Sequence, residues 1–133
     1  MYHQTVKELI EAWDKGETIW TIEMGGLGPG YEQAIQIAAV EMARAGQHVV
    51  MTGDKEKDGA AWREVCDAAL AKIDKDLGGL TGAMYYAASH LAFQWCHGDG
   101  PAGLIKRYEN EGQGERVMQC NKGFPKAPEH HTV

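Results

Sequence analysis

Residues 20–46 read WTIEMGGLGPGYEQAIQIAAVEMARAG, and this stretch decides the fold. It begins with alternating apolar residues, passes through four glycines and a proline, and continues in a helical pattern. The alternation of branched and aromatic side chains predicts a strand over residues 18–24. The apolar spacing after the glycines predicts a helix over residues 29–45 that ends at Gly46. The stretch therefore predicts a strand, a glycine corner and a helix.

The glycine corner has two interpretations. Backbone amides at a helix start attract anions, and small residues let a ligand come close to them. Neither the P-loop motif nor the dinucleotide-binding motif is present, because Tyr31 and Glu32 follow the glycines where a P-loop has Lys and Ser or Thr. Glu23 adds further negative charge beside the corner. We therefore favour a close-packed turn, with an anion site as the alternative. The candidate ligand-binding glycines are Gly26, Gly28 and Gly30.

The helix over residues 29–45 has two faces of different polarity. One face consists of Tyr31, Ala34, Ile35, Ala38 and Met42. The polar residues Glu32, Gln33, Gln36 and Arg44 gather on the other face. The alanines would let another backbone come close to the helix.

Four more helices are expected elsewhere in the chain, over residues 5–15, 60–77 and 82–97 and from the GDGPAG corner to about residue 111. Thr5 and Glu8 form a capping box at the start of the first. Asp58 and Asp99 are the expected N-caps of the second and the last. The helix over residues 82–97 is apolar on nearly all sides, which predicts that it is the central helix of the core.

The expected fold class is α+β and mainly helical, with about five helices around a small sheet of two or three strands. The sheet would contain residues 18–24, with residues 116–120 as a candidate for a further strand. Residues 48–52 are either another strand or a connection. An all-α fold is the alternative. We expect residues 1–120 to form a single compact domain, followed by an extended or mobile tail over residues 121–133, which contain two prolines and two histidines.

Composition excludes several classes of protein. The 133 residues are 44% hydrophobic, which suffices for one core. A net charge of −6 disfavours binding to nucleic acid. No apolar run is long enough to cross a membrane, and the N-terminus lacks the pattern of a secretory signal. Three cysteines at irregular spacing favour free thiols in a reducing cytoplasm, with one disulfide or a reactive thiol as the alternative. They are Cys66, Cys96 and Cys120.

The sequence predicts neither a metal site nor a cofactor. His90 and His97 are seven residues apart on one helix, a rise of about 10.5 Å, so these two side chains cannot share one ion. We expect a core or half-buried position for His90 and a place at the helix end for His97. Ser89 lacks the glycines of a nucleophile elbow, so we expect it to ease helix packing.

The hypothesis for a site is a pocket between the helix over residues 82–97 and the corner at residues 25–31. Tyr31 and Tyr86 would line it, because tyrosine combines an apolar ring with a polar tip. Glu23 would act as an acid or base, with His90 or His97 as its partner.

The sequence leaves two classes of function open. The chain contains no specific catalytic motif, so we expect a small cytoplasmic binding or interaction module. Such a module would hold a partner chain or a second copy of itself through an apolar surface, and self-association is part of this hypothesis. The alternative is a small enzyme or small-molecule binder that uses the pocket beside residues 25–31. Neither hypothesis involves nucleic acid or a membrane.

Overall fold

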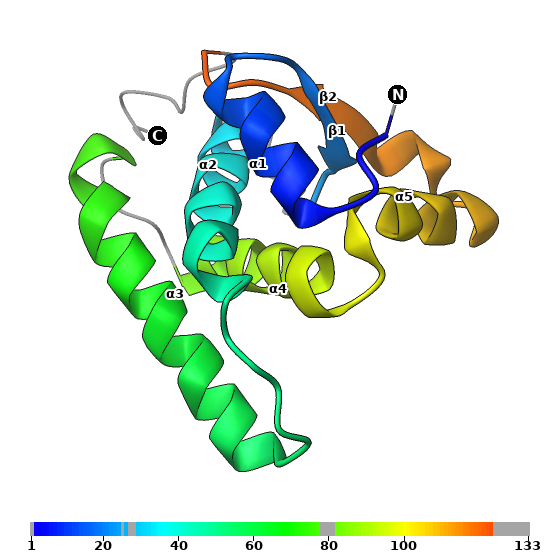
Figure 1. The fold of residues 1–133 in the computed structure, drawn as a ribbon. Coiled ribbons are helices and arrows are strands. Elements are labelled where there is room, and N and C mark those ends of the chain that lie inside the picture. Colours follow the sequence, from blue (N-terminus) through cyan, green and yellow to red (C-terminus); the bar gives the residue numbers. More distant parts are fainter. Residues whose placement is uncertain (1, 25, 27–28, 78–81, 124–133) are drawn as a thin grey trace.

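Over the residues that the structure describes, the protein folds into five α-helices and a two-stranded antiparallel sheet (Figure 1). The computed structural model describes residues 2–24, 26, 29–77 and 82–123. Its elements are α1 (Val6–Asp14), β1 (Ile19–Ile22), α2 (Pro29–Gly46), α3 (Lys55–Leu77), α4 (Gly82–His97), α5 (Gly100–Asn110), the 3-10 helix η1 (Gly114–Arg116) and β2 (Val117–Cys120). The mainly helical α+β class is confirmed, and the sheet excludes the all-α alternative.

The sheet joins two segments that lie far apart in the sequence. β1 and β2 pair so that Ile19 faces Cys120 and Ile22 faces Val117. The strands predicted over residues 18–24 and 116–120 are confirmed in shorter form. Of the two interpretations of residues 48–52, the strand is wrong and the connection is correct, because this segment is irregular backbone that leads into α3. Hydrogen bonds from Thr52 and Gly53 to Asp58 fix its end, in place of a strand partner.

The central helix is α2, which packs against α1, α3 and α4. The small and apolar residues of α2 are fully buried and include Ala34, Ile35, Ala38, Ala39, Val40, Met42 and Ala43. The prediction that α4 is central is wrong. α4 buries one face, while Tyr86 and His90 on its other side are exposed. Apolar composition is a poor guide here, because folded proteins leave much apolar surface in contact with water.

Three of the four residues on the polar face of α2 are buried, and the fourth, Arg44, is half-buried. Glu32, Gln33 and Gln36 are at most 2% exposed. Thr21 of β1 donates a hydrogen bond to Gln36 Oε1 (2.9 Å), and Gln36 Nε2 donates to the Ile22 carbonyl (2.9 Å). These side chains complete the hydrogen bonding of the sheet, which has only two strands to satisfy its backbone.

Two further contacts tie α2 to the strands. Gln33 Nε2 donates to the Asn121 carbonyl (2.6 Å), and the Cys120 thiol donates to Gln33 Oε1 (2.8 Å). Among the described residues, every buried side-chain nitrogen and oxygen has a hydrogen-bond partner. We call this group the α2–sheet junction; its members are Thr21, Glu32, Gln33, Gln36 and Cys120.

The helix caps agree with the prediction at α1 and differ at α3. The Glu8 amide donates to Thr5 Oγ1 (3.2 Å), which confirms Thr5 as the N-cap, and the Thr5 hydroxyl donates to Glu8 Oε1 (3.2 Å). α3 begins at Lys55 rather than at residue 60, because Asp54 accepts from the amides of residues 56 and 57. Asp58 is therefore inside the helix and is not its N-cap. Asp99 precedes α5 as predicted but makes no capping bond with its side chain, which pairs with Arg107 (3.0 Å).

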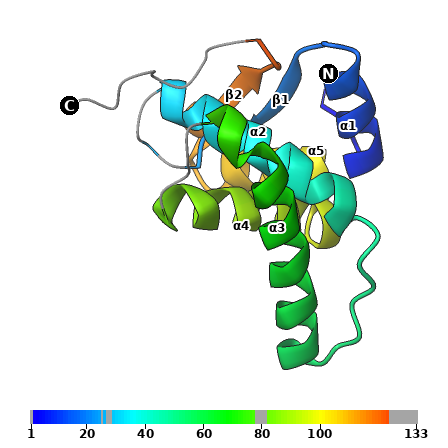
Figure 2. The same cartoon turned by 90° about the vertical axis from the view of Figure 1, so that its left-hand side faces the viewer.

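One part of the chain extends away from the other elements. Residues 48–61, which comprise the loop before α3 and its first two turns, project below the sheet and the remaining helices (Figures 1 and 2). We call this segment the arm. Within the described part of the chain, no helix combines the length and the apolar composition needed to cross a membrane. The predicted tail beyond residue 123 lies outside the described residues.

Candidate functional site

The arm is attached to the other helices through Trp62. This ring is 8% exposed and meets the ring of Phe93 edge to face, with centroids 5.2 Å apart. Its indole Nε1 donates to Ser89 Oγ (3.1 Å). The expected role of Ser89 in helix packing is thereby confirmed, because its hydroxyl holds α3 against α4. Aromatic pairs of this kind add about 0.5–1.5 kcal/mol to the gain from area burial.

Gly46, the last residue of α2, makes room for the Trp62 ring. A Cβ atom at this position would overlap carbon atoms of the indole. The carbonyl of Gly46 bonds to His97 Nε2 (3.0 Å), and the His97 ring lies 5.7 Å from that of Trp62. The ends of α2 and α4 and the side of α3 therefore meet around one indole ring.

The loop of the arm is held in place by Asp58. Its Oδ1 accepts from the amide (2.9 Å) and the hydroxyl (2.8 Å) of Thr52, and its Oδ2 accepts from the Gly53 amide (3.0 Å). Hydrogen bonds from the Thr52 backbone and side chain lower the pKa of this carboxyl, because they favour its charged form. The loop is thus closed back onto the helix that follows it.

A pocket with a volume of about 420 Å³ opens between this loop, α3 and α4. We call it the arm pocket. Its lining residues are Met51, Gly53, Lys55, Asp58, Gly59, Trp62 and Phe93. The apolar lining comes from Met51, Trp62 and Phe93, while the Asp58 carboxylate already accepts three hydrogen bonds. The pocket therefore presents mainly apolar side chains and has few polar groups to offer a ligand.

An exposed apolar side chain stands next to the pocket. Val50 precedes Met51 in the loop and is 80% exposed. Tyr86 on α4, at 76%, is the other large hydrophobic side chain that is exposed among the described residues. The arm thus combines an apolar pocket and an apolar protrusion on adjacent positions of the chain.

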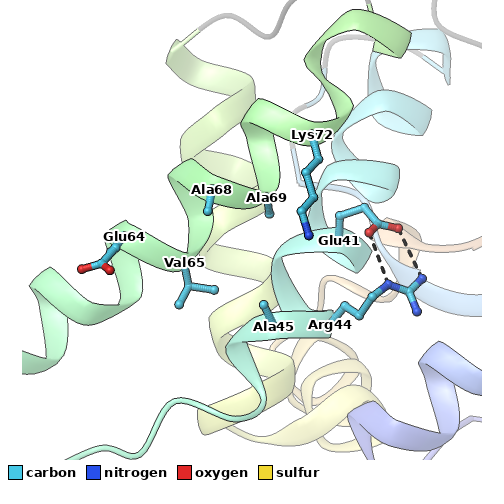
Figure 3. A pocket seen from close by; sticks show the side chains of 8 residues that line it. All are labelled: Glu41, Arg44, Ala45, Glu64, Val65, Ala68, Ala69 and Lys72. Carbon is cyan, nitrogen blue, oxygen red and sulfur yellow. Dashed lines mark hydrogen bonds and ion pairs between the residues drawn. The ribbon is translucent and has the colours of Figure 1, made fainter.

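A second cavity, of about 320 Å³, lies between α2 and α3 (Figure 3). It is lined by Glu41, Arg44, Ala45, Glu64, Val65, Ala68, Ala69 and Lys72. Figure 3 shows Lys72 extending from α3 toward the paired Glu41 and Arg44 of α2. Arg44 also makes two hydrogen bonds of 2.8 Å to Asp14, which raise its pKa. Its guanidinium is already engaged, so this cavity has less to offer a ligand than the arm pocket.

The residues of the predicted pocket are distributed over several regions. Glu23 follows β1, where its amide donates to the Arg116 carbonyl (2.7 Å) and its carbonyl accepts from the Arg116 guanidinium (2.8 Å). Tyr31 is half-buried against the core. Tyr86 and His90 are both exposed on α4, so the expectation of a core or half-buried His90 is wrong.

Glu23 and His97 lie near opposite ends of α2. The amide of Met24, the neighbour of Glu23, donates to Glu32 Oε1 (2.7 Å) in the first turns of the helix. His97 contacts Gly46 at the other end. At 1.5 Å per residue, the helix separates these two contact points by about 21 Å. The structure does not bring this pair together.

The glycine corner is described only in part. Gly26 is exposed with φ of +64°, a conformation that favours glycine, and Gly30 is in the first turn of α2. Gly28 and its neighbours at positions 25 and 27 lie outside the described residues. A pocket or an anion site at this corner therefore stays a prediction.

The three cysteines are free thiols. Burial raises the pKa of Cys96 to about 12, and burial together with the charge of Glu32 raises the pKa of Cys120 to about 12. Burial also raises the pKa of Cys66. A thiol with a raised pKa is a poor nucleophile, since the thiolate is the reactive form. Among the described residues, no group of three or more His, Cys, Asp and Glu side chains is arranged to hold a metal ion.

The sequence contains a weak signal for the arm pocket. Residues 49–51 (Val-Val-Met) are apolar and precede a polar turn, a composition that favours a strand. An apolar segment without a strand partner is instead a candidate contact surface.

Comparisons with protein-family models, with curated proteins and with solved structures find no match to this chain. The geometry of the described residues therefore carries the functional argument alone.

Proposed function

We propose that this protein is a binding module that holds an aliphatic segment of a polypeptide in the arm pocket. The observation that carries the proposal is the pocket of about 420 Å³ formed by Met51, Trp62 and Phe93 beside the exposed Val50. Met51 and Phe93 are half-buried and Trp62 is 8% exposed, so their apolar surface is reached through the pocket. Its volume is in the range that proteins use for ligands.

A polypeptide suits this pocket better than a small polar molecule. Small-molecule sites orient their ligands with a few well-placed polar groups. Asp58, which lines the pocket, already accepts hydrogen bonds from Thr52 and Gly53. Lys55 is left as a lining cation at the edge of an apolar surface. Apolar contact with charges around it is the usual anatomy of a protein interface.

The position of the arm supports the same proposal. The arm projects from the other elements, so a partner reaches it without displacing any part of the core (Figure 2). Trp62 anchors the arm to α4 through Ser89, and Asp58 fixes the loop. A surface that is already ordered loses less conformational entropy when it binds. The proposal includes a reducing, cytoplasmic compartment, which suits the three free thiols.

The test is a titration of isotope-labelled protein with a blocked trileucine peptide, followed by amide chemical shifts. Millimolar peptide is expected to shift the amides of Met51, Gly53 and Gly59, which line the pocket, and to leave the amide of Tyr86 unchanged. Met51→Lys should abolish these shifts, because a cation would enter the apolar lining. Tyr86→Ser is the matched control and should bind as the parent does. Shifts that are absent, or that persist in Met51→Lys, would refute the proposal.

A further inference from the structure

We infer that the polypeptide held by the arm pocket is the arm of a second copy of this chain, so that two arms pair about a two-fold axis. This inference rests on the proposed binding function and names its partner. A two-fold interface uses the same patch on both copies, so each patch must contain both halves of every contact. The arm meets this requirement in shape and in charge.

The shape requirement is met by Val50 and the pocket. Val50 is 80% exposed, and the next residue, Met51, lines the pocket together with Trp62 and Phe93. A two-fold axis close to this loop brings the Val50 of each copy against the apolar lining of the other. Both protrusions and both pockets are then covered at once, so no apolar group of the arm is left in water. A partner with a pocket alone, or a protrusion alone, would cover only half of this surface.

The charge requirement is met by the first turn of α3 and the residue before it. Positions 54–58 read Asp-Lys-Glu-Lys-Asp, so the sign of the charge alternates along the segment. Lys55 and Lys57 are two residues apart on α3 and point to different sides of the helix, whereas Lys55 and Asp58, of opposite charge, both line the pocket. A two-fold axis beside the pocket can therefore place Lys55 of each copy beside the Asp58 carboxylate of the other. A segment of one sign would repel its own copy. Charge complementarity of this kind fixes the register of an interface more than it adds affinity.

The arrangement of the molecule favours the arm as the place of pairing. The net charge of the chain is −6, and the arm carries only a small part of it, since two lysines offset Asp54, Glu56 and Asp58. The arms project, so they meet while the more acidic bodies of the two copies stay apart (Figures 1 and 2). A segment of this length covers less than the roughly 800 Å² per partner of a standard interface. We therefore expect a dimer of micromolar affinity that exchanges with the monomer.

The test is sedimentation velocity of the full chain from low micromolar to near-millimolar concentration at physiological salt. The weight-average mass should double over this range. Val50→Lys should weaken the dimer at least about tenfold, because each copy would bring a charge into an apolar pocket. The variant should fold normally, since Val50 is mostly exposed. Tyr86→Lys, which places the same charge at the other exposed hydrophobic residue, should dimerise as the parent does.

A second pair of variants tests the charge pattern. Reversing Lys55 and Lys57 to Glu makes the segment wholly acidic and should weaken the dimer in any antiparallel register. Reversing Lys7 and Lys106, which are exposed on α1 and α5, to Glu changes the net charge equally and should have little effect. Salt at this concentration screens charges more than about 8 Å apart, so only local contacts count.

The outcomes separate this inference from the proposed function. A chain that stays monomeric at every concentration, while trileucine still shifts the pocket amides, would refute self-pairing and leave the binding module standing with a different partner. A dimer that Val50→Lys and Tyr86→Lys weaken equally would place the contact elsewhere and would also refute it. A monomer without peptide binding would refute both proposals. A dimer lost in Val50→Lys and displaced by the peptide supports both.

Discussion

The α2–sheet junction and the arm both depart from the usual placement of residues. The junction buries polar side chains, and the arm exposes an apolar one. The junction buries Glu32, Gln33 and Gln36 almost completely, whereas the arm leaves Val50 80% exposed. The buried polar groups all have partners within the chain. The exposed apolar surface of the arm has no cover among the described elements. A buried polar residue is explained by its hydrogen-bond partner within the chain, and for the exposed apolar residue of the arm we propose a partner in another molecule.

The junction is the part of the fold where polar side chains replace a missing strand. A sheet of two strands leaves one edge of each strand without a backbone partner. Gln36 bonds to Thr21 and to the Ile22 carbonyl on β1, and Gln33 bonds to Cys120 and to the Asn121 carbonyl at the end of β2. These contacts fix how α2 lies on the sheet, and with it the position of Gly46 at the other end of the helix. The arm is therefore held in place by a helix that the junction orients.

Gln36→Leu should destabilise the fold more than a change at any residue of the arm. Leucine fits the volume but leaves the Thr21 hydroxyl and the Ile22 carbonyl without their partner. Each buried polar group that loses its hydrogen bond costs about 1–3 kcal/mol, so we expect the two groups together to lower the free energy of unfolding by about 2–6 kcal/mol. Urea unfolding followed by circular dichroism measures it.

Gln119→Leu is the matched control for this change. Gln119 is on β2 opposite Trp20 and is exposed, so its replacement should alter stability by less than about 0.5 kcal/mol. Equal unfolding midpoints for the two variants would show that the junction bonds contribute nothing to the fold. A large loss in Gln36→Leu with an unchanged dimer would show that the arm tolerates movement of α2.

The existence and order of the helices could be predicted because their signals are local. The Thr5 and Glu8 capping box acts over one turn, and the apolar spacing in α3 repeats over several turns. The N-terminal boundary of α3 is harder to predict, because Asp54 and Asp58 are both acceptable caps by sequence. Which of them caps the helix depends on the hydrogen bonds of the loop, and Asp58 is engaged by Thr52 and Gly53.

Neither the α2–sheet junction nor the candidate site could be predicted, because both depend on contacts between residues that are distant in the sequence. Gln36 resembles a surface residue until β1 is placed against it, since its partners are Thr21 and Ile22. Residues 48–52 have the composition of a strand but find no strand to pair with. Helical spacing places Trp62 on the apolar face of α3, yet its meeting with Phe93 depends on how α3 crosses α4. The spacing of apolar residues and the composition of a segment do not show which distant residues come into contact.

Gly46→Ala tests the connection between the two regions and should have the next largest effect. The new methyl group would overlap the Trp62 ring, which would have to move away from Ser89 and Phe93. Overpacking of this kind costs about 1–3 kcal/mol. The variant should also lose dimer affinity, because the displaced ring is part of the pocket. Urea unfolding and sedimentation velocity measure the two effects.

Gly59→Ala provides the contrast on the arm itself. Gly59 lies within α3, and a Cβ atom there would meet nothing within 4 Å. Alanine should therefore stabilise the helix by about 0.5–1 kcal/mol. Opposite signs for the two glycine variants are expected. A loss of stability in Gly59→Ala, or none in Gly46→Ala, would contradict the packing described around Trp62.

Alkaline pH should destabilise the folded state, because Cys120 of the junction is a buried thiol. The effect of a single thiol should be smaller than the effects of the substitutions above. The pKa of Cys120 is raised from 9.0 to about 12 by burial and by the charge of Glu32, so the folded state keeps its proton after the unfolded chain has lost it. Stability then falls as pH rises above about 9, by up to about 1.4 kcal/mol per pH unit for one such group. Cys96 has the same shift from burial and acts in the same direction.

Cys120→Ser isolates the contribution of the junction thiol. Serine keeps a donor for Gln33 but does not ionise, so the urea midpoint of this variant should fall less steeply than that of the parent between about pH 8 and 10, a range that brackets the unfolded pKa. Cys66 lies away from the junction. Cys66→Ser should therefore leave unchanged the contribution of Cys120 to the fall of the urea midpoint with pH. Identical slopes for Cys120→Ser and the parent would mean that the thiol ionises in the folded state as readily as in the unfolded chain, and that the junction does not shield it.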